Sequence, residues 1–128
     1  HGPGQRVVYP IIKLKDIMKE LDIRKYIKML ENIIVCTLKE FKINAYIIDD
    51  KIGVWTDKGK IASIGVRVRK GVAFHGIAVN INPNLQNFSG IIPCGLADAK
   101  IISIHEYNSN ITMQVFDKIL QLILCFLI

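Results

Sequence analysis

The sequence predicts an α+β domain in which a mostly antiparallel sheet is flanked by helices. Strand-like segments follow one another through the middle of the chain, over 45–48, 52–56, 60–69 and 72–82, with short turn signals between them. Helical patterns precede and follow this run of strands. A succession of strands with helices before and after it is typical of α+β folds.

The first elements are a turn, a short strand and a helix. His1-Gly2-Pro3-Gly4 is a turn or loop, and the β-prone run 6–9 follows it. Residues 23–41 have apolar side chains at intervals of three and four, which predicts a helix with one apolar stripe. Asp22 is the expected N-cap of this helix. Cys36, within it, is expected to be a small buried hydrophobe.

Turn residues and glycines organise the strands. Asp57-Lys58-Gly59 and Lys70-Gly71 are predicted turns on either side of 60–69. Alternation along 60–69 gives one face to Ser63, Gly65, Arg67 and Arg69 and the other to Ile64, Val66 and Val68. Glycine in mid-strand marks a bulge or a close approach. Gly65 and Gly76 therefore form either the floor of a slot for an extended apolar chain or a place of tight sheet packing.

The last third of the chain has an irregular segment and a helix. Residues 82–95 are rich in Asn, Pro and Gly, and 112–128 are expected to form a helix whose apolar end packs on the core. The apolar run 119–128 is much shorter than the roughly 20 residues needed to cross a bilayer. We expect no membrane span.

Composition sets broader limits. A chain of 128 residues, 51% hydrophobic and 22% charged, is predicted to form a single domain over 1–128 with a packed core. The net charge of +6 can attract nucleic acid, anionic lipid or acidic proteins, and charge alone does not choose among them. The three cysteines lack metal-type or redox-type spacing, so we expect reduced thiols, a cytoplasmic location and no metal.

Cys94 is either a nucleophile or a structural loop cysteine, and its immediate neighbours do not decide between the two. It lies between Pro93 and Gly95, a pairing that holds a side chain on a constrained turn. A free thiol with a pKa near 8.5 is only a few per cent ionised at neutral pH, so it needs a neighbouring cation or base. His75 and Lys60 are both candidates for that role, and spacing does not decide between them.

Six ordered blocks of sequence resemble the lipoyl(octanoyl) transferases over almost the whole chain. The blocks are His1-Gly2-Pro3-Gly4-Gln5 with Val7-Val8-Tyr9-Pro10, Gly53-Val54-Trp55, Lys60-Ile61-Ala62-Ser63-Ile64-Gly65-Val66, Phe74-His75-Gly76, Asn80-Ile81-Asn82-Pro83 and Pro93-Cys94-Gly95-Leu96. The resemblance implies a fold similar to the catalytic domain of the biotin and lipoate ligases. It also implies that Cys94 carries the acyl group as a thioester and that Lys60 promotes ionisation of the thiol and shuttles protons.

The remaining roles also follow from the resemblance. Octanoate would pass from acyl carrier protein to a lysine of the lipoyl domains of oxoacid dehydrogenases and of the glycine cleavage H protein, without ATP, metal or other cofactor. The residues that match substrate-contacting stretches are His1, Gly2, Ser63, Ile64, Gly65, His75, Gly76, Ile77 and Ala78. Both protein partners are acidic in this family, so the net charge of +6 would steer them to the enzyme.

The family pattern also has an N-terminal portion ahead of the block that starts at His1, with an Arg-Gly-Gly stretch. We therefore expect this chain to be an N-terminally truncated catalytic domain that lacks one wall of the slot and exposes apolar surface. Three alternatives stay open: an inactive remnant of the family, an ATP-dependent lipoate–protein ligase, and a basic nucleic-acid-binding domain supported only by charge.

Overall fold

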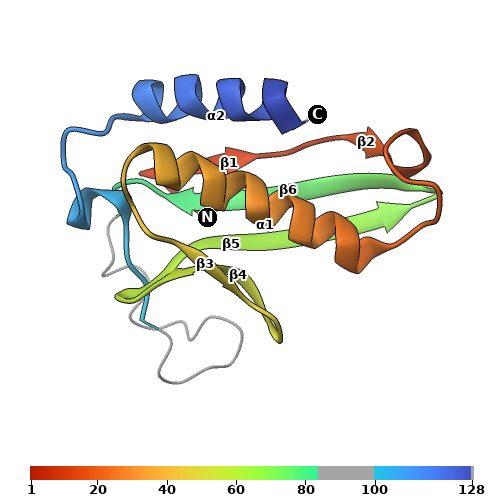
Figure 1. The fold of residues 1–128 in the computed structure, drawn as a ribbon, viewed down its shortest axis with the longest axis horizontal. Helices are drawn as coiled ribbons and strands as arrows, with labels where there is room; N and C mark the ends of the chain where they lie inside the picture. The colour runs from red at the N-terminus through yellow and green to blue at the C-terminus, as the bar shows by residue number, and fades with distance from the viewer. Residues whose placement is uncertain (84–99, 128) are drawn as a thin grey trace.

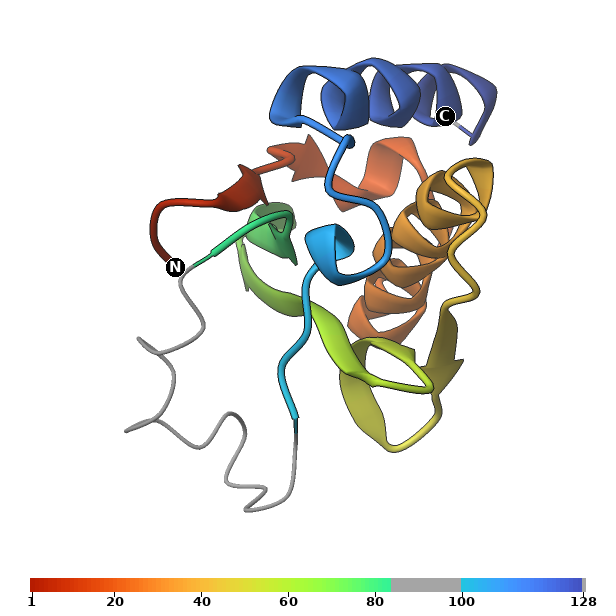
Figure 2. The same ribbon diagram turned by 90° about the vertical axis from the view of Figure 1, so that its left-hand side faces the viewer.

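A computed structural model describes residues 1–83 and 100–127 of the chain. These residues form a six-stranded antiparallel sheet with two long helices on one of its faces (Figures 1 and 2). The sheet comprises β1 (Gln5–Val8), β2 (Ile12–Lys13), β3 (Tyr46–Ile48), β4 (Lys51–Thr56), β5 (Gly59–Arg69) and β6 (Val72–Asn80). Their order is β1-β6-β5-β4-β3, and β2 also pairs with β6. The predicted α+β class is confirmed.

The helices are α1 (Ile23–Glu40) and α2 (Met113–Leu127), with short 3-10 turns η1 (Leu14–Asp16) and η4 (Ile104–Glu106). Asp22 is the N-cap of α1, as predicted: its Oδ1 accepts a hydrogen bond from the Lys25 backbone N–H at 3.0 Å. Residues 52–56 and 72–82 of the sequence prediction correspond to β4 and β6 within one or two residues at each end. The sequence patterns did not reveal β2 or the two 3-10 turns.

The β5–β6 hairpin is the longest pairing in the sheet. Its register runs from Ala62 opposite Val79 to Arg69 opposite Val72. Lys70 and Gly71 both have positive φ, 52° and 77°, as a two-residue turn of type I′ requires. Gly65 lies directly opposite Gly76. The alternation predicted along β5 is confirmed, because Ser63 and Arg67 are exposed while Ile64 and Val68 pack toward the core.

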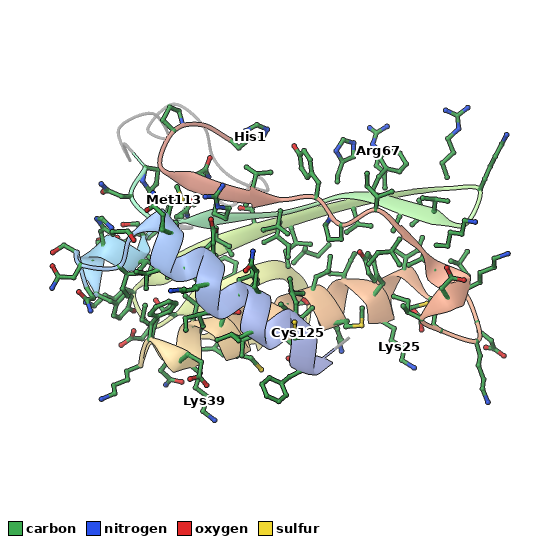
Figure 3. The ribbon with its side chains drawn as sticks, turned by 90° about the horizontal axis from the view of Figure 1, so that it is seen from above. His1, Lys25, Lys39, Arg67, Met113 and Cys125 are labelled. Carbon is green, nitrogen blue, oxygen red and sulfur yellow. The ribbon has the colours of Figure 1, made fainter. Side chains whose placement is uncertain are left out.

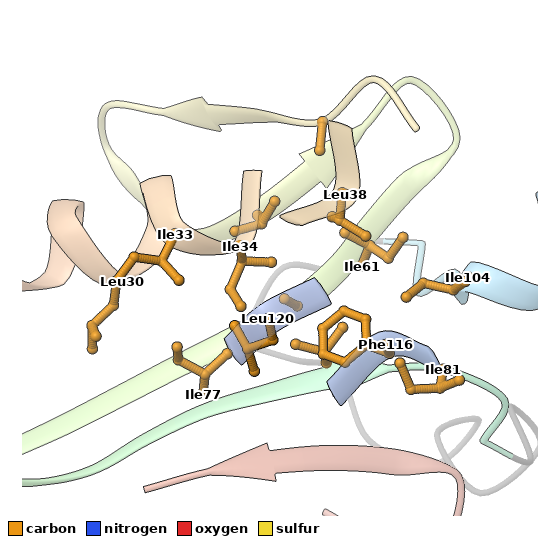
Figure 4. Close-up of a cluster of buried hydrophobic side chains, with 14 of the residues drawn as sticks. Leu30, Ile33, Ile34, Leu38, Ile61, Ile77, Ile81, Ile104, Phe116 and Leu120 are labelled. Atoms are coloured by element: carbon orange, nitrogen blue, oxygen red, sulfur yellow. The ribbon is translucent and has the colours of Figure 1, made fainter. Parts of the chain in front are cut away.

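The core lies between the helices and the sheet (Figure 4). Helix α1 contributes a stripe that includes Leu30, Ile34 and Leu38, and α2 contributes Phe116 and Leu120. An ion pair between Arg6 Nε and Asp117 Oδ1, 2.8 Å apart, ties β1 to α2 at the edge of this layer. Cys36 is predicted to be buried, but it lies on the flank of the stripe and is only half-buried.

The apolar end of α2 is only partly covered. Ile123 and Leu124 pack against the core, whereas Phe126 is 86% exposed and Leu122 is also exposed. The expectation that the apolar end of this helix packs on the core is therefore confirmed for Ile123 and Leu124. It is wrong for Leu122 and Phe126, which lie on the exposed side of the helix. Within the described part of the chain, no helix is both long enough and apolar enough to cross a membrane.

Candidate active site

The face of the sheet opposite the helices carries a groove of about 480 Å³. Figure 3 shows His1 and Arg67 on this side of the sheet, away from α1 and α2. The groove is lined by His1, Val7, Tyr9, Ser63, Ile64, Gly65, Val66, Arg67, His75, Gly76, Ile77 and Ala78. Eight of the nine predicted substrate residues line it together, from three separate parts of the sequence. Gly2 does not; its backbone N–H donates to Gln5 Oε1 at 2.6 Å.

The two facing glycines play different parts. A methyl group at Gly65 would meet nothing within 4 Å, so this position keeps the floor of the groove open. A methyl group at Gly76 would collide with the Val8 carbonyl oxygen and lie 2.7 Å from Pro10 Cδ. The sequence left a slot and tight packing as alternatives, and the structure shows one at each glycine. Gly76 lets the chain after β1 pass close above β6.

His75 leaves the regular alternation of β6. Its partner across the sheet, Val66, packs toward the helices, so position 75 belongs to the same covered face. His75 is nevertheless exposed and has φ = 64°, a left-handed conformation that non-glycine residues rarely adopt. Its ring meets the Tyr9 ring edge-on, with centroids 5.8 Å apart, and Tyr9 Oη lies 3.3 Å from His1 Nε2. These three side chains form one wall of the groove.

Lys60 lies at the start of β5, three residues before Ser63, and is only 3% exposed. Its backbone N–H donates to the Lys100 carbonyl at 2.8 Å, and its carbonyl accepts from the Ile102 N–H at 2.9 Å. Its Nζ lies 5.5 Å from the centroid of the Trp55 ring, a cation–π contact. Lys60 is therefore a buried lysine near the start of β5, and the middle of the same strand forms the groove.

A bulge next to Lys60 changes the direction of its side chain. Val54 pairs with Ala62, but Trp55 pairs with Lys60, so Ile61 is an extra residue in β5. Such a bulge shifts the alternation by one residue and redirects the side chains beyond it. As a result Ile61 is in the core, labelled in Figure 4, while Lys60 lies against Trp55. Simple alternation would have placed Lys60 on the face of Ala62.

Glu31 is a buried acid near Lys60 that the sequence patterns did not bring forward. It is 3% exposed, and its Oε2 accepts a hydrogen bond from the Gly53 N–H at 2.9 Å. Burial raises the pKa of Glu31 above its ordinary value, while the hydrogen bond from Gly53 and the charges of Lys28 and Lys60 act in the opposite direction. Its spacing in the sequence is a signal of this burial, because Glu31 lies four residues after Ile27 and three before Ile34, within the apolar stripe.

Cys94 lies outside the described residues, so its predicted role stays a prediction. Cys36 and Cys125 are free thiols. Over residues 1–83 and 100–127, no group of three His, Cys, Asp or Glu side chains is arranged to hold a metal ion.

Comparison with known proteins gives the chain a family. The model of the lipoyl protein ligase A/B catalytic domain matches residues 1–124. A protein of Rickettsia peacockii named octanoyltransferase is 51% identical over 126 residues, which cover 94% of this chain and 60% of the relative. The chain thus spans about 60% of the length of the curated relatives it matches.

Solved structures share the fold at low sequence identity. A lipoate protein ligase of Thermoplasma acidophilum, described with its E2 lipoyl domain, superimposes with a TM-score of 0.76 at 13% identity and covers 99% of this chain and 52% of its own. The biotin protein ligase of Aquifex aeolicus gives 0.72 at 13% identity, over 97% of this chain and 52% of its own. The predicted likeness to this fold is confirmed. The match across residues 1–124 and the 51% identity together show that this chain belongs to the family of the lipoyl protein ligase A/B catalytic domain.

Proposed function

We propose that this chain is the catalytic domain of an octanoyltransferase that moves an octanoyl group from acyl carrier protein to a lysine of a lipoyl domain. The observation that carries the proposal is the groove on the open face, because it gathers eight predicted substrate residues beside a buried lysine on the same strand. The relatives at about 50% identity, which bear the name octanoyltransferase, support the acyl group and the reaction type.

The groove suits a saturated acyl chain. Its floor is open at Gly65, and its lining includes Val7 and Ala78, which lie opposite each other in β1 and β6. Each buried CH₂ contributes roughly 0.8 kcal/mol, so the six methylenes of an octanoyl chain would gain up to about 5 kcal/mol from apolar contact. The strand rises about 3.3 Å per residue, which puts Gly65 roughly 16 Å along β5 from Lys60, room enough for eight carbons.

In the first half of the reaction, the Cys94 thiolate attacks the carbonyl carbon of the octanoyl thioester. The new bond joins Cys94 Sγ to the acyl carbon, and the bond to the carrier's thiol breaks. Lys60 supplies a positive charge that favours the thiolate, and its ammonium gives the departing sulfur a proton. Lys100, six residues after Cys94 in the sequence, accepts a hydrogen bond from the Lys60 backbone N–H through its carbonyl oxygen, which supports the proposed pairing of Cys94 with Lys60.

In the second half, the amine of a lipoyl-domain lysine attacks the acyl carbon of the thioester. The carbon–sulfur bond to Cys94 breaks, the amine loses a proton, and the octanoyl group becomes an amide. Lys60, neutral after the first half, accepts that proton and returns to its charged form. Formation of an amide from a thioester is downhill, so the reaction as proposed uses no ATP.

The partners and the location follow from the same proposal. The acyl carrier protein and the lipoyl domains of oxoacid dehydrogenases and of the glycine cleavage H protein are the proposed donor and acceptors. The net charge of +6 supports electrostatic steering of acidic partners. A cytoplasmic location stays a prediction.

The test is intact-mass spectrometry after incubation with octanoyl-acyl carrier protein. We expect one octanoyl adduct on the wild-type chain and on the control variants Cys36→Ser and Cys125→Ser, and none on Cys94→Ser. Lys60→Ala should form the adduct slower by about 10²-fold or more. A second incubation with a lipoyl domain should move the adduct to a lysine of that domain.

Each contrary outcome overturns the proposal in a distinct way. An adduct that survives Cys94→Ser would remove Cys94 as the acyl carrier. Transfer that requires ATP and leaves no adduct would assign the chain to the ligases. A wild-type chain that forms no adduct and transfers nothing would be the inactive remnant of the family.

A further inference from the structure

Glu31 is a carboxyl group placed where the helix pattern calls for an apolar side chain. It lies in the stripe of α1 between Ile27 and Ile34 and is nearly completely buried. A charged side chain in such a place loses several kcal/mol of hydration unless partners replace the water. The groups that contact the Glu31 carboxyl therefore indicate its role in the structure.

Its hydrogen-bond partner is the backbone of β4. Tyr46 pairs with Trp55 and Ile48 with Lys51, so the register slips across the stretch that contains Gly53. A slipped register leaves backbone groups without a ladder partner. Glu31 Oε2 takes up the Gly53 N–H at 2.9 Å and so joins α1 to β4 at this irregular point.

The side chain of Lys60 lies on the same glycine. Gly53 has φ = 134°, and a methyl group built on it would be 2.5 Å from Lys60 Cε and 3.3 Å from Lys60 Nζ. The lysine end therefore rests directly over the Gly53 Cα. Glu31, Gly53 and Lys60 form a connected set across α1, β4 and β5, and the charge of Lys60 is one of the influences that lower the pKa of Glu31.

Other positively charged side chains lie near Lys60, so a negative charge from Glu31 would reduce the repulsion between them. Lys51 Nζ, from β4, lies 5.6 Å from the Trp55 ring centroid, so two cations share one indole ring. Lys28, from α1, adds a third positive charge near Glu31, although it is well exposed and lies 4.0 Å from Asp49. Like charges disfavour a buried ammonium, and the Glu31 carboxylate opposes them.

We propose that Glu31 is a positioning residue for Lys60: its carboxylate fixes the Gly53 backbone on which the lysine side chain rests and supplies a negative charge on the same side of the fold as the buried ammonium. The link to catalysis rests on the proposed function, in which Lys60 must be a cation when the Cys94 thiolate forms. The contact between Glu31 and Lys60 stands apart from that function and can be measured without any acyl transfer.

The direct test follows the Lys60 side chain by NMR of chain labelled with ¹³C at lysine Cε. Glu31→Gln keeps an oxygen that can accept from the Gly53 N–H and removes only the charge. The charges of Glu31 and Lys60 act on each other, because Lys60 is one of the groups that lower the pKa of Glu31. Loss of the negative charge in Glu31→Gln should therefore move the titration midpoint of the Lys60 resonance to lower pH.

Asp49→Asn is the matched control, because it removes one negative charge from the same region at an exposed site. It should move the Lys60 midpoint less than Glu31→Gln does, since exposed charges are screened by salt. Equal midpoints in wild type, Glu31→Gln and Asp49→Asn would overturn the proposal.

A reciprocal measurement covers the case in which Glu31→Gln fails to fold. In Lys60→Met, the ¹³C resonance of the Glu31 carboxyl should titrate at a higher pH than in wild type, because the cation that lowers the pKa of Glu31 has gone. An unmoved Glu31 midpoint would again overturn the proposal.

A kinetic test, independent of the NMR measurements, follows the rate of formation of the Cys94 adduct as a function of pH. Provided that the wild-type chain forms the Cys94 adduct, Glu31→Gln should shift the alkaline limb of the pH–rate profile for adduct formation to lower pH. Glu31→Asp, which restores the charge, should return the limb toward wild type. A wild-type chain without adduct would refute the proposed function and leave the NMR result to decide the role of Glu31.

Discussion

At the scale of single residues, the candidate site depends on backbone conformations that few residues tolerate. His75 has φ = 64° in the middle of β6, and Gly53 has φ = 134° in β4. Left-handed conformations at non-glycine residues cost of order 1–3 kcal/mol and gather at functional sites. At His75 the conformation turns an imidazole into the groove from a position that alternation assigns to the core face.

This conformation predicts how position 75 responds to substitution. Asn tolerates the left-handed region and Val does not, because a branched Cβ collides with the backbone there. We expect His75→Val to be less stable than His75→Asn by about 1–2 kcal/mol in urea denaturation. Arg67→Val, on the neighbouring strand, does not carry this strain and should be at least as stable as Arg67→Asn, because branched residues are favoured in strands. Equal stability of the two substitutions at 75 would contradict the prediction.

At the scale of elements, the β5–β6 hairpin both builds the groove and limits it. Regular pairing from Ala62 to Arg69 aligns Ser63 and Arg67 along the open face, while β1 crosses beside Gly76. The bulge at Ile61 ends this regularity and turns Lys60 toward Trp55. The hairpin supplies the floor of the groove, and its irregular end holds the lysine.

The two facing glycines give a paired prediction for this hairpin. Gly76→Ala must push aside the Val8 carbonyl and Pro10, so we expect a loss of about 2–3 kcal/mol in unfolding free energy. Gly65→Ala enters open space and should leave stability within about 0.5 kcal/mol of wild type. On the proposed function, Gly65→Ala should nevertheless slow formation of the octanoyl adduct, because its methyl group occupies the floor of the groove.

Urea denaturation of both variants and intact-mass kinetics of Gly65→Ala check this pair. A stable Gly76→Ala would show that β1 does not press on β6 at this place. An unchanged rate in Gly65→Ala would place the acyl chain elsewhere than over residue 65.

At the scale of the whole molecule, one layer of helices covers one face of the sheet (Figures 2 and 3). The other face carries the groove. The core is continuous between α1, α2 and the face of the sheet that they cover, and the buried Glu31 lies at its margin. Ionisation of that one carboxyl therefore bears on the stability of the entire fold.

The pH dependence of stability has a definite sign. The pKa of Glu31 is raised in the folded chain above the ordinary 4.5, so between these two values the folded state binds more protons than the unfolded state. Stability from this group is present below pH 4.5 and falls as the pH rises toward the folded pKa. We expect the unfolding free energy of Glu31→Gln to gain on that of wild type as the pH rises from about 4.5 to 7.

Urea denaturation at a series of pH values compares the two proteins, with Asp49→Asn as the control for a surface carboxylate. Parallel curves for wild type and Glu31→Gln would contradict the prediction. A growing difference in the opposite direction would mean that the hydrogen bond and the two lysines outweigh burial at Glu31.

The sequence by itself determined the order and type of the long elements and the residues of the groove. Helix α1 and strands β5 and β6 follow from periods of 3.6 and 2, which depend only on local geometry. The Asp22 cap is also local. The family blocks placed Ser63, Gly65 and Gly76 among the substrate residues, and the structure brings them to one groove.

The tertiary structure alone decided which way the exceptional side chains point. The bulge at Ile61, the left-handed His75 and the contact between Glu31 and Gly53 each arise where strands slip in register or pack against another element. Such choices depend on partners far away in the sequence, which a periodic pattern does not contain. The same holds for Phe126, because the last stretch of α2, 122–127, has no polar residue to reveal which of its sides the core will cover.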